Sequence, residues 1–366
     1  MSTIESIDIS KNLGQLIVTG ISGTALSLEE SEFILKDNIG GVILFAHNFS
    51  DPAQLAELIN EIQKLRDEFP LYIMTDHESG RVQRFKNQFT HFPSQFELAK
   101  LNSPKTIYEV HQMMATELKA CGVNVNLSPC CDIWSNPLNK VIGDRSFGTD
   151  ELSVDKMVSA AIRGLHAGGV LSCAKHFPGH GSTKKDSHIE LPYLKTTIEE
   201  LKKFELVPFN RAIKSKVDFM MMAHIVVDAI DKMNPISLSP SAHNLLREEY
   251  RFNGIIITDD LEMGAILEKH TIEEASMLAL IAGANLLLYR KCETAKNSLE
   301  FLKVKYRERK IDRKLIEFSI QKNLFLKKEK FSGYRPVYIP EISSLMQTSL
   351  HKNYHQELIK KLSQAS

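Results

Sequence analysis

A cluster of side chains that can bind a polar molecule and move protons follows one apolar segment of the chain. Residues 169–174 are apolar, and they precede the stretch KHFPGHG at residues 175–181 and DSH at residues 186–188. The apolar segment predicts a buried strand that ends at Ala174, and the glycines and proline after it predict a loop. Asp186 and His188 are two positions apart, so in an extended segment their side chains point the same way. A carboxylate bonded to one imidazole nitrogen fixes the role of the other, so this spacing predicts a proton-transfer dyad.

Polar and mostly charged residues also follow four of the other predicted strands. For any one of these groups alone, an ion pair that ties two loops together is as good an explanation as an active site. A desolvated charge is unfavourable unless it is paired or used, so charges at five strand ends favour an active site. The stretches are DHESGRVQR at residues 76–84, GDRSFG at residues 143–148, His224, and TDDLEM at residues 258–263.

Eight short apolar runs recur along the chain, with room for a helix between each pair. Strands that are too apolar to have a wet face and that alternate with helices predict a parallel sheet covered by helices. We therefore predict an α/β fold, a single (β/α)8 TIM-type barrel with extra C-terminal helices, whose active site lies at the C-terminal ends of the strands. An open, doubly wound sheet is the alternative. The runs are residues 15–19, 41–45, 71–75, 123–127, 170–174, 218–223, 254–258 and 284–288.

Helix start signals lie between these runs. Serine or threonine three residues before glutamate has capping-box spacing, and Asp-Pro or Ser-Pro combines a capping side chain with proline at the first helical position. Gly168-Gly169 predicts the end of the helix before the fifth strand. The start signals are Ser27 with Glu30, Thr197 with Glu200, Thr271 with Glu274, Asp51-Pro52 and Ser239-Pro240.

The chain changes character after the eighth run. We expect a catalytic barrel over residues 1–290 and a helical extension over residues 291–366 that packs on the barrel. Residues 292–330 are rich in lysine, arginine and leucine at helical spacing. This basic character indicates either a solvated helix face or an anionic partner, and we favour the solvated face.

Composition limits the kinds of partner. The 366 residues include 45 lysines and arginines and 45 aspartates and glutamates, so the overall charge does not favour nucleic acid or an anionic membrane. We expect a small-molecule substrate, no nucleic-acid partner and no membrane partner. The N-terminus is polar and acidic, and no run approaches the roughly 18 apolar residues of a membrane helix, so we expect a cytoplasmic protein. The five cysteines have no metal-type spacing, so we interpret them as reduced, mostly buried thiols.

Taken together, the motifs resemble the family 3 glycoside hydrolases. DHESGRVQR, GDRSFG, KHFPGHG with DSH, and TDDL occur in the family's order, each at a predicted strand end, from about residue 13 to about residue 290. The sequence KHF is shared with the β-glucosidases of the wider family. The loop from Pro178 through residues 186–188 narrows the resemblance to the single-domain bacterial β-N-acetylhexosaminidases of peptidoglycan recycling. That resemblance implies a hydrolase that releases N-acetylglucosamine from 1,6-anhydro-N-acetylmuramyl peptides. It also implies no metal or organic cofactor, and we expect a monomer.

The resemblance implies a role for each matching residue. Asp259 is expected to be the nucleophile, and His188 the general acid/base, with Asp186 as its orienting partner. Glycoside hydrolysis requires a carboxylate for the anomeric carbon and a proton donor for the leaving oxygen, and this pair would retain the β configuration through a covalent intermediate. Asp186 would favour the imidazolium form and so tune its pKa. The residues expected to hold the terminal sugar are Asp76, Arg84, Arg145, Lys175 and His176.

Three residues depart from the usual pattern of that branch: His77 stands for glutamine, Ser79 for glycine and Asn285 for aspartate. They bear on fine substrate preference and not on the reaction class. The alternatives are a family 3 β-glucosidase or a glycosyl phosphorylase on the same scaffold, and a non-catalytic muropeptide-sensing module. We expect His180 to order the loop after the fifth strand, where Gly179 and Gly181 serve either as hinges or only as turn residues.

Overall fold

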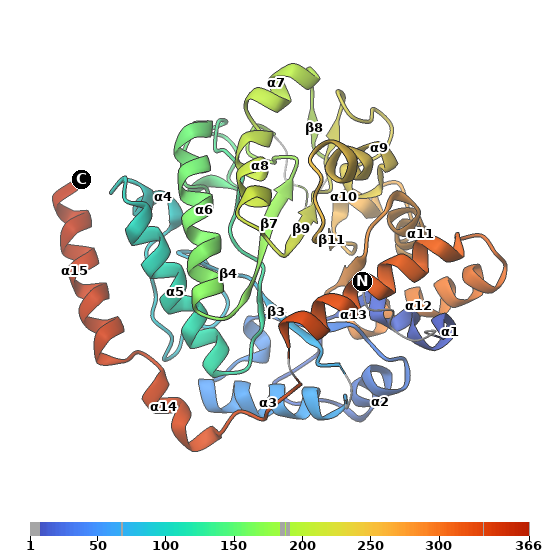
Figure 1. The fold of residues 1–366 in the computed structure, drawn as a ribbon, viewed down its shortest axis with the longest axis horizontal. Helices are drawn as coiled ribbons and strands as arrows, with labels where there is room; N and C mark the ends of the chain where they lie inside the picture. The colour runs from blue at the N-terminus through green and yellow to red at the C-terminus, as the bar shows by residue number, and fades with distance from the viewer. Residues whose placement is uncertain (1–7, 67–68, 184–186, 188–190, 332, 366) are drawn as a thin grey trace.

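A closed barrel of eight parallel strands forms the centre of the molecule (Figure 1). The computed structural model describes residues 8–66, 69–183, 187, 191–331 and 333–365. Each predicted run overlaps one barrel strand, so the barrel prediction is confirmed and the alternative of an open sheet is wrong. In barrel order the strands are β1 (Ile17–Thr19), β12 (Leu286–Tyr289), β11 (Ile255–Asp260), β9 (Phe219–Met222), β7 (Leu171–Phe177), β6 (Val125–Asn126), β3 (Tyr72–Thr75) and β2 (Gly41–Leu44).

The fifth of these strands, β7, is longer than predicted. It continues past Ala174 through Phe177, because the Lys175 carbonyl accepts from the Cys131 amide at 2.6 Å and the Phe177 carbonyl from the Ala223 amide at 2.9 Å. The prediction that the strand ends at Ala174 was therefore wrong, and the loop begins at Pro178. Lys175 and His176 are thus held by a strand, which fixes their positions more firmly than a loop would.

Helices cover the outside of the barrel and begin where the capping signals predict. Capping boxes form at Ser27, Thr197 and Thr271, in each case with the predicted glutamate. Gly168 caps the end of α6, and Gly169 follows it with φ of +83°. The covering helices are α2 (Leu28–Lys36), α3 (Pro52–Lys64), α4 (Gln95–Ala99), α5 (Pro104–Ala120), α6 (Glu151–Ala167), α7 (Ile198–Lys203), α8 (Leu206–Lys214), α9 (Pro240–Asn244), α10 (Gly264–Leu267), α11 (Ile272–Ala282) and α12 (Cys292–Arg307).

The inside of the barrel is packed with side chains and is not a pore. Alternate strand residues point inward, so each strand contributes large apolar groups such as Tyr72, Phe219 and Ile257, all fully buried. The aromatic rings of Tyr72 and Phe219 meet edge to face at 5.3 Å. This packed interior supports the cavity that opens above it.

Helix α13 (Arg313–Lys330) closes the N-terminal end of the barrel. The Tyr72 hydroxyl donates to the Asn323 carbonyl at 3.1 Å, and Lys327 Nζ donates to Gln15 Oε1 at 2.8 Å and to the Gly40 carbonyl at 2.7 Å. Tyr72, Gln15 and Gly40 lie at or just before the first residues of strands, so α13 lies opposite the ends from which the predicted site residues project.

The last helices wrap the side of the barrel. α14 (Ile342–Leu345) packs near α3, and α15 (Ser349–Ala365) runs beside α5 at the edge of the molecule (Figure 1). His351 Nδ1 lies 2.8 Å from Glu117 Oε1, and the Tyr354 hydroxyl donates to Glu109 at 3.0 Å. These contacts agree with an extension that packs on the barrel, while the division at residue 290 remains a prediction.

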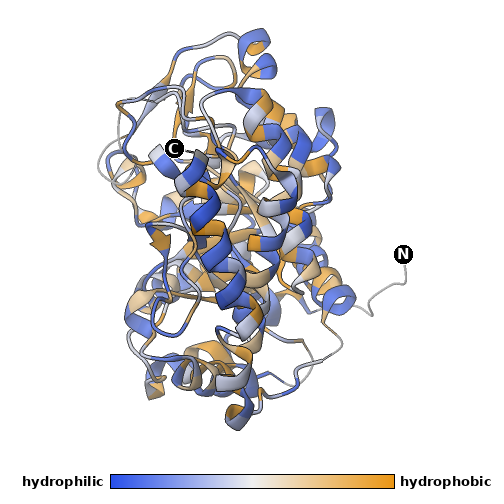
Figure 2. Cartoon of the chain, turned by 90° about the vertical axis from the view of Figure 1, so that its left-hand side faces the viewer, coloured by the Kyte–Doolittle hydropathy of each residue, from blue (hydrophilic) through white to orange (hydrophobic). Residues whose placement is uncertain are grey.

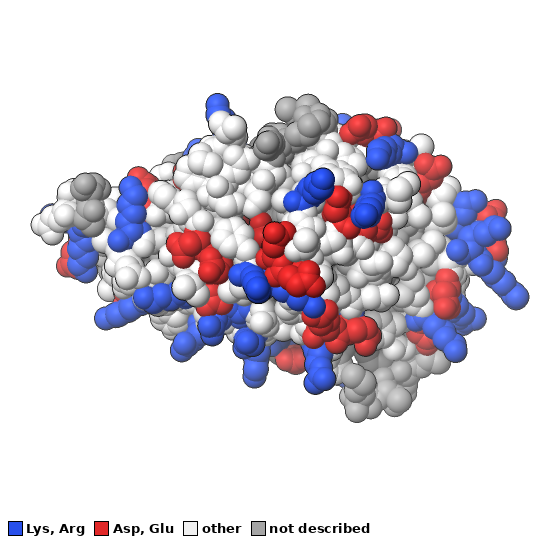
Figure 3. Space-filling view, turned by 90° about the horizontal axis from the view of Figure 1, so that it is seen from above, with Lys and Arg blue, Asp and Glu red and all other residues white. Residues whose placement is uncertain are grey.

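The surface carries both charges without a dominant sign. Seen from the side, hydrophilic and hydrophobic residues alternate along the helices (Figure 2). Lysine and arginine are interspersed with aspartate and glutamate over the face in Figure 3, as the equal numbers of the two kinds suggest. None of the described helices is long and apolar enough to cross a membrane.

Candidate active site

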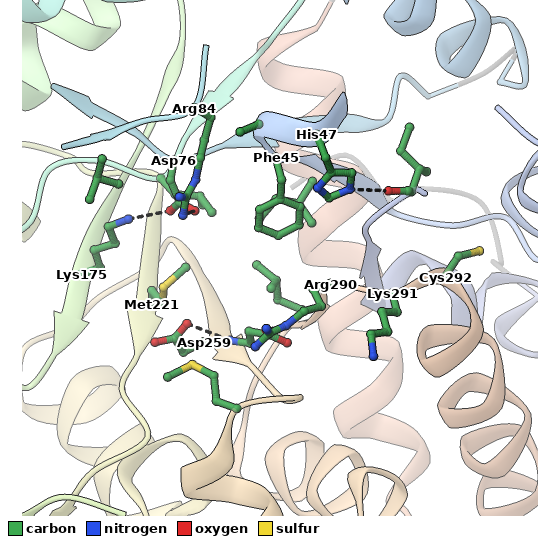
Figure 4. Close-up of a pocket in the computed structure, with 18 of the residues that line it drawn as sticks. Phe45, His47, Asp76, Arg84, Lys175, Met221, Asp259, Arg290, Lys291 and Cys292 are labelled. Carbon is green, nitrogen blue, oxygen red and sulfur yellow. Dashed lines mark hydrogen bonds and ion pairs between the residues drawn. The ribbon is translucent and has the colours of Figure 1, made fainter. Parts of the chain in front are cut away.

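A cavity of about 1400 Å³ opens at the C-terminal ends of the barrel strands. Side chains from different strands point into it, including Asp76 after β3, Lys175 on β7 and Asp259 on β11 (Figure 4). The prediction that strand-end residues converge is therefore confirmed for four of the five strand ends, whereas His224, after β9, is buried and does not line the cavity. The predicted residues that line this one cavity are Asp76, Arg84, Arg145, Lys175, His176 and Asp259.

Asp76 is clamped between two cations on one side of the cavity. Its Oδ1 lies 2.7 Å from Lys175 Nζ, and its Oδ2 lies 2.9 Å from the Arg84 guanidinium. Burial by itself raises the pKa of the Asp76 carboxyl, but the charges of Lys175 and Arg84 outweigh it and hold the pKa well below its usual value. Asp76 is therefore a fixed carboxylate with lone pairs left over for ligand hydroxyls.

Glu78 was given no role by the sequence, yet it joins two of the predicted sugar-binding residues. Both of its oxygens accept from Arg145 at 2.8 Å, and Oε1 also lies 2.5 Å from Lys175 Nζ. Burial opposes ionisation, but Arg145 and Lys175 together lower the pKa of Glu78 to about 2. The two-residue spacing from Asp76 was the signal in the sequence, because two carboxylates at that spacing share a side.

Asp132 is the second site residue that the sequence did not predict. It is fully buried, and its Oδ2 lies 2.7 Å from Nδ1 of His176. Burial raises the pKa of its carboxyl, but His176 and other donors outweigh burial and hold the pKa well below its usual value. A lone aspartate between Cys131 and Ile133, in an otherwise apolar run, was the available sign of a buried and partnered carboxylate.

One group of described residues has the composition of a metal site. Ligand atoms of Cys130, Asp132 and His176 lie within 4.8 Å of one another. Hydrogen bonds already link them, because the Cys130 thiol donates to Asp132 Oδ2 at 3.1 Å and His176 Nδ1 approaches the same oxygen. Burial also raises the pKa of the Cys130 thiol well above its usual value, which opposes the thiolate that a metal prefers. We interpret the group as a hydrogen-bonded cluster.

Asp259 and Asp260 are neighbours in different environments. Asp259 is half-buried and lines the cavity, where its Oδ1 accepts from the Asp260 amide at 2.8 Å. Asp260 instead pairs with Arg290 at 2.5 Å through Oδ2 and with the Glu262 amide through Oδ1. Burial raises the pKa of the Asp260 carboxyl to about 6. The second acid is thus tied to the wall of the cavity, and Asp259 remains the candidate for chemistry.

The predicted dyad is outside the described residues, because neither Asp186 nor His188 is among them. Ser187, between them in the sequence, is described: it is buried, lines the same cavity as Asp259, and its carbonyl accepts from the Ala265 amide at 3.2 Å. Ser187, which lies between the two predicted dyad residues in the sequence, is therefore part of the cavity wall.

His180 orders the start of that loop. Its Nε2 lies 2.9 Å from the Ser187 hydroxyl, and its Nδ1 lies 2.8 Å from the Thr183 hydroxyl. Burial lowers the pKa of His180 to about 4, so the ring is neutral at pH 7. Gly179 has φ of +129°, and a Cβ on Gly181 would lie 1.7 Å from the Ile133 carbonyl oxygen, so local geometry alone explains both glycines.

The side chain of His77 does not line the cavity. Its ring is buried against Phe85 and Phe89, with centroids 5.9 and 5.5 Å away. Neither ring nitrogen has a hydrogen-bond partner among the described residues, and burial lowers the pKa of His77 to about 3. The residue therefore acts as a neutral packing group beneath the loop after β3.

The sequence of the chain is similar to those of known proteins. A family model described as "Glycosyl hydrolase family 3 N terminal domain" matches residues 8–323. A protein named "Beta-hexosaminidase" from Tolumonas auensis is 38% identical over 276 residues, which cover 74% of this chain and 81% of that protein. Another of that name, from Idiomarina loihiensis, is 36% identical over 281 residues, which cover 75% and 83%.

A solved structure is similar over nearly the whole chain. It is that of a glycoside hydrolase family 3 β-N-acetylglucosaminidase from Paenibacillus sp. str. FPU-7, with a TM-score of 0.91 and 33% identity. The match covers 99% of this chain and 69% of that one. The likeness therefore includes the C-terminal helices as well as the barrel.

Proposed function

The chain belongs to glycoside hydrolase family 3, and from that premise we propose that it is a retaining exo-β-N-acetylglucosaminidase. Its substrates would be GlcNAc-1,6-anhydro-MurNAc peptides, the fragments handled in cell-wall recycling. The single observation that carries the proposal is that Asp259 shares one cavity with the sugar-binding set around Asp76 and Lys175. The names of the similar proteins, β-hexosaminidase and β-N-acetylglucosaminidase, support the choice of sugar.

Asp259 is the nucleophile in this mechanism. Its carboxylate attacks C1 of the terminal sugar from one face while the C1–oxygen bond to the leaving group breaks, which forms a covalent glycosyl-enzyme. Met221 and Leu288, both inward on neighbouring strands, also line the cavity and help to exclude bulk water from this step. Water then displaces Asp259 and restores the β configuration.

His188 is the general acid and then the general base. As imidazolium it gives its proton to the leaving oxygen, and as a neutral ring it takes a proton from the incoming water. Asp186 favours the imidazolium and keeps the ring oriented. Support for this role is the position of Ser187, the residue between the two, on the wall of the same cavity as Asp259.

The sugar hydroxyls are held by the charged side of the cavity. Asp76 accepts hydrogen bonds from two neighbouring hydroxyls, while Arg84, Lys175 and Arg145 donate to others. These four residues are already fixed by their own ion pairs, so little side-chain freedom is lost when the sugar binds.

The cavity is larger than one sugar needs, and two of the lysines that line it are exposed. Its volume of about 1400 Å³ exceeds the roughly 300–1,000 Å³ of an ordinary small-molecule pocket. Lys291, labelled in Figure 4, and Lys140 line it, and among the described residues no carboxylate pairs with either. Exposed lysines suit the carboxylates of a muropeptide better than a neutral disaccharide.

We also propose a cytoplasmic location and no requirement for a cofactor. The five cysteines are free and four are buried, as is usual for a protein of a reducing compartment. Hydrolysis by Asp259 and His188 needs neither metal nor redox chemistry, so chelator treatment should leave turnover within about twofold of the untreated rate.

Turnover of aryl β-N-acetylglucosaminide and aryl β-glucoside, each with and without phosphate, tests the proposal. We expect a strong preference for the N-acetylated sugar and no gain with phosphate. Equal rates on both sugars would favour a β-glucosidase, and a phosphate-dependent rate a phosphorylase. Trapping the intermediate with a fluorinated N-acetylglucosaminyl fluoride should label the peptide that contains Asp259; a label elsewhere would remove Asp259 from its role.

A further inference from the structure

Asp132 joins three of the described segments at the sugar-binding wall, and we propose that it is a positioning residue for the hydrolysis. It sets the tautomer of His176 and ties His176 to the base of the loop that carries the proton donor. The inference rests on the proposed function, because it gives His176 the role of binding the terminal sugar.

Three segments are joined through Asp132. On β7, its Oδ2 lies 2.7 Å from His176 Nδ1, and its carboxylate also accepts from the His176 amide at 3.2 Å. At the base of the loop, Oδ1 accepts from the His180 amide at 2.7 Å. Its main-chain carbonyl accepts from the Ser146 hydroxyl at 2.7 Å, one residue beyond Arg145. One fully buried residue thus connects the sugar-binding histidine, the loop and the arginine turn.

The carboxylate decides which nitrogen of His176 carries the proton. An ionised carboxylate only accepts hydrogen bonds, so a neutral His176 must hold its proton on Nδ1. Nε2 is then an acceptor, and the Arg145 guanidinium, 3.4 Å away, is placed to donate to it. A sugar hydroxyl that displaces this long contact can donate to the same Nε2 lone pair, which an Nε2–H tautomer does not offer.

The same carboxylate fixes where the loop begins. With the His180 amide bonded to Asp132, the His180 ring lies beside Ser187 and Thr183. A change at Asp132 therefore reaches both the sugar, through His176, and the segment around Ser187, without Asp132 itself touching the substrate.

Asp132→Asn separates these effects from simple loss of folding. Asparagine can keep an oxygen toward the His180 amide, while its NH2 turns toward His176 Nδ1 and moves the proton to Nε2. We expect kcat/KM on an aryl N-acetylglucosaminide to fall about 10- to 100-fold, mainly because KM rises. An effect of this size is expected when a hydrogen bond to a charged group is lost. The dissociation constant for N-acetylglucosamine, measured by calorimetry, should rise at least about tenfold.

The tautomer is read directly by ¹⁵N NMR of protein labelled at histidine nitrogen, with the His176 signals identified by their loss in His176→Ala. In the neutral ring, the unaltered protein should show a protonated Nδ1 and an unprotonated Nε2, and Asp132→Asn should show the reverse. This readout needs no turnover, so it stands apart from failure of the proposed function, which would show as an absence of hydrolysis in the unaltered protein.

Two further variants make the outcome decisive. Cys130→Ala removes only the thiol contact to the same carboxylate and should stay within about threefold of the starting kcat/KM. In the His176→Ala background, Asp132→Asn should lower kcat/KM by less than about threefold, since the partner through which it acts is gone. An Nε2–H tautomer in the unaltered protein, or an undiminished effect of Asp132→Asn without His176, would overturn the proposal.

Discussion

Replacing Glu78 by glutamine should destabilise the protein far more than removing a nearby surface carboxylate. Glu78 is the only described carboxylate that bonds both Arg145 and Lys175, at 2.8 and 2.5 Å. Glutamine keeps the size of the side chain, but it loses the charge and turns an NH2 group toward one of two cations. Arg145 then lacks its carboxylate partner and Lys175 keeps only Asp76, and removing one side of a buried ion pair is the costly way to break it.

The magnitude follows from burial. The Glu78 side chain is 1% exposed and that of Arg145 is 10% exposed, so solvent screening is small. Removing one partner of such a pair lowers the free energy of unfolding by about 3–5 kcal/mol. At about 2.1 cal/mol/K per residue, 366 residues give an unfolding entropy of about 0.8 kcal/mol/K, so we expect Tm to fall by about 4–6 °C.

Calorimetric melting at pH 7 of Glu78→Gln beside Asp144→Asn provides the measurement and its control. Asp144 pairs with Arg81 at 2.8 Å and joins the same two loops, but those side chains are 42% and 47% exposed. An exposed pair contributes about 0–1 kcal/mol, so the control should lose about 1 °C or less.

The effect should also depend on pH in a defined direction. The pKa of Glu78 is lowered to about 2 in the folded state from a usual value of 4.5, so its stabilisation is complete above pH 4.5 and is lost as pH falls toward 2. The difference in Tm between the unaltered protein and Glu78→Gln should therefore narrow as pH falls from 4.5 toward 2. Equal losses of Tm in Glu78→Gln and Asp144→Asn at pH 7 would refute the reasoning.

Three other changes have expected outcomes. Asp259→Ala should lose at least about 1,000-fold in kcat on aryl N-acetylglucosaminide, because a nucleophile cannot be replaced by binding alone; unchanged turnover would exclude its role. His188→Ala should lose much less rate on a dinitrophenyl glycoside than on a natural disaccharide, since a good leaving group needs no proton; equal losses would argue against acid catalysis. Burial lowers the pKa of Lys327 below its usual 10.5, so unfolding takes up a proton and stability should rise as pH increases toward 10.5, by up to about 1.4 kcal/mol per unit. Lys327→Met should remove that slope in melts between pH 7 and 9.5, and a slope that persists would assign it to other groups.

Periodicity and strand-end chemistry predicted the barrel and most of the site. Each apolar run became a strand because its residues are buried on both faces, and this pattern depends little on distant sequence. The C-terminal ends of parallel strands meet at one end of a barrel, so Asp76, Lys175 and Asp259 were predicted to converge from their positions in the runs alone.

Glu78 and Asp132 could not be assigned in the same way because their importance lies in pairs that span the fold. Glu78 meets Arg145 across 67 residues, and Asp132 meets His176 across 44. The local signs, which are the spacing of Glu78 from Asp76 and the apolar neighbours of Asp132, do not identify these distant partners. The end of β7 was misplaced for a related reason, since Lys175 looks like a loop residue until the Asp76 and Glu78 carboxylates that neutralise it are in view.

Any recombinant fragment that stops at residue 290 would leave one end of the barrel uncovered. Without α13, the Gly40 carbonyl loses its hydrogen bond from Lys327 Nζ, and the Tyr72 hydroxyl loses the Asn323 carbonyl. Expression boundaries for a minimal enzyme therefore belong after Lys330, although every residue assigned to chemistry precedes residue 290. The loops at the C-terminal ends of the strands make none of these contacts with α13. They can therefore be exchanged in directed evolution without removing the contacts that cover the N-terminal end of the barrel.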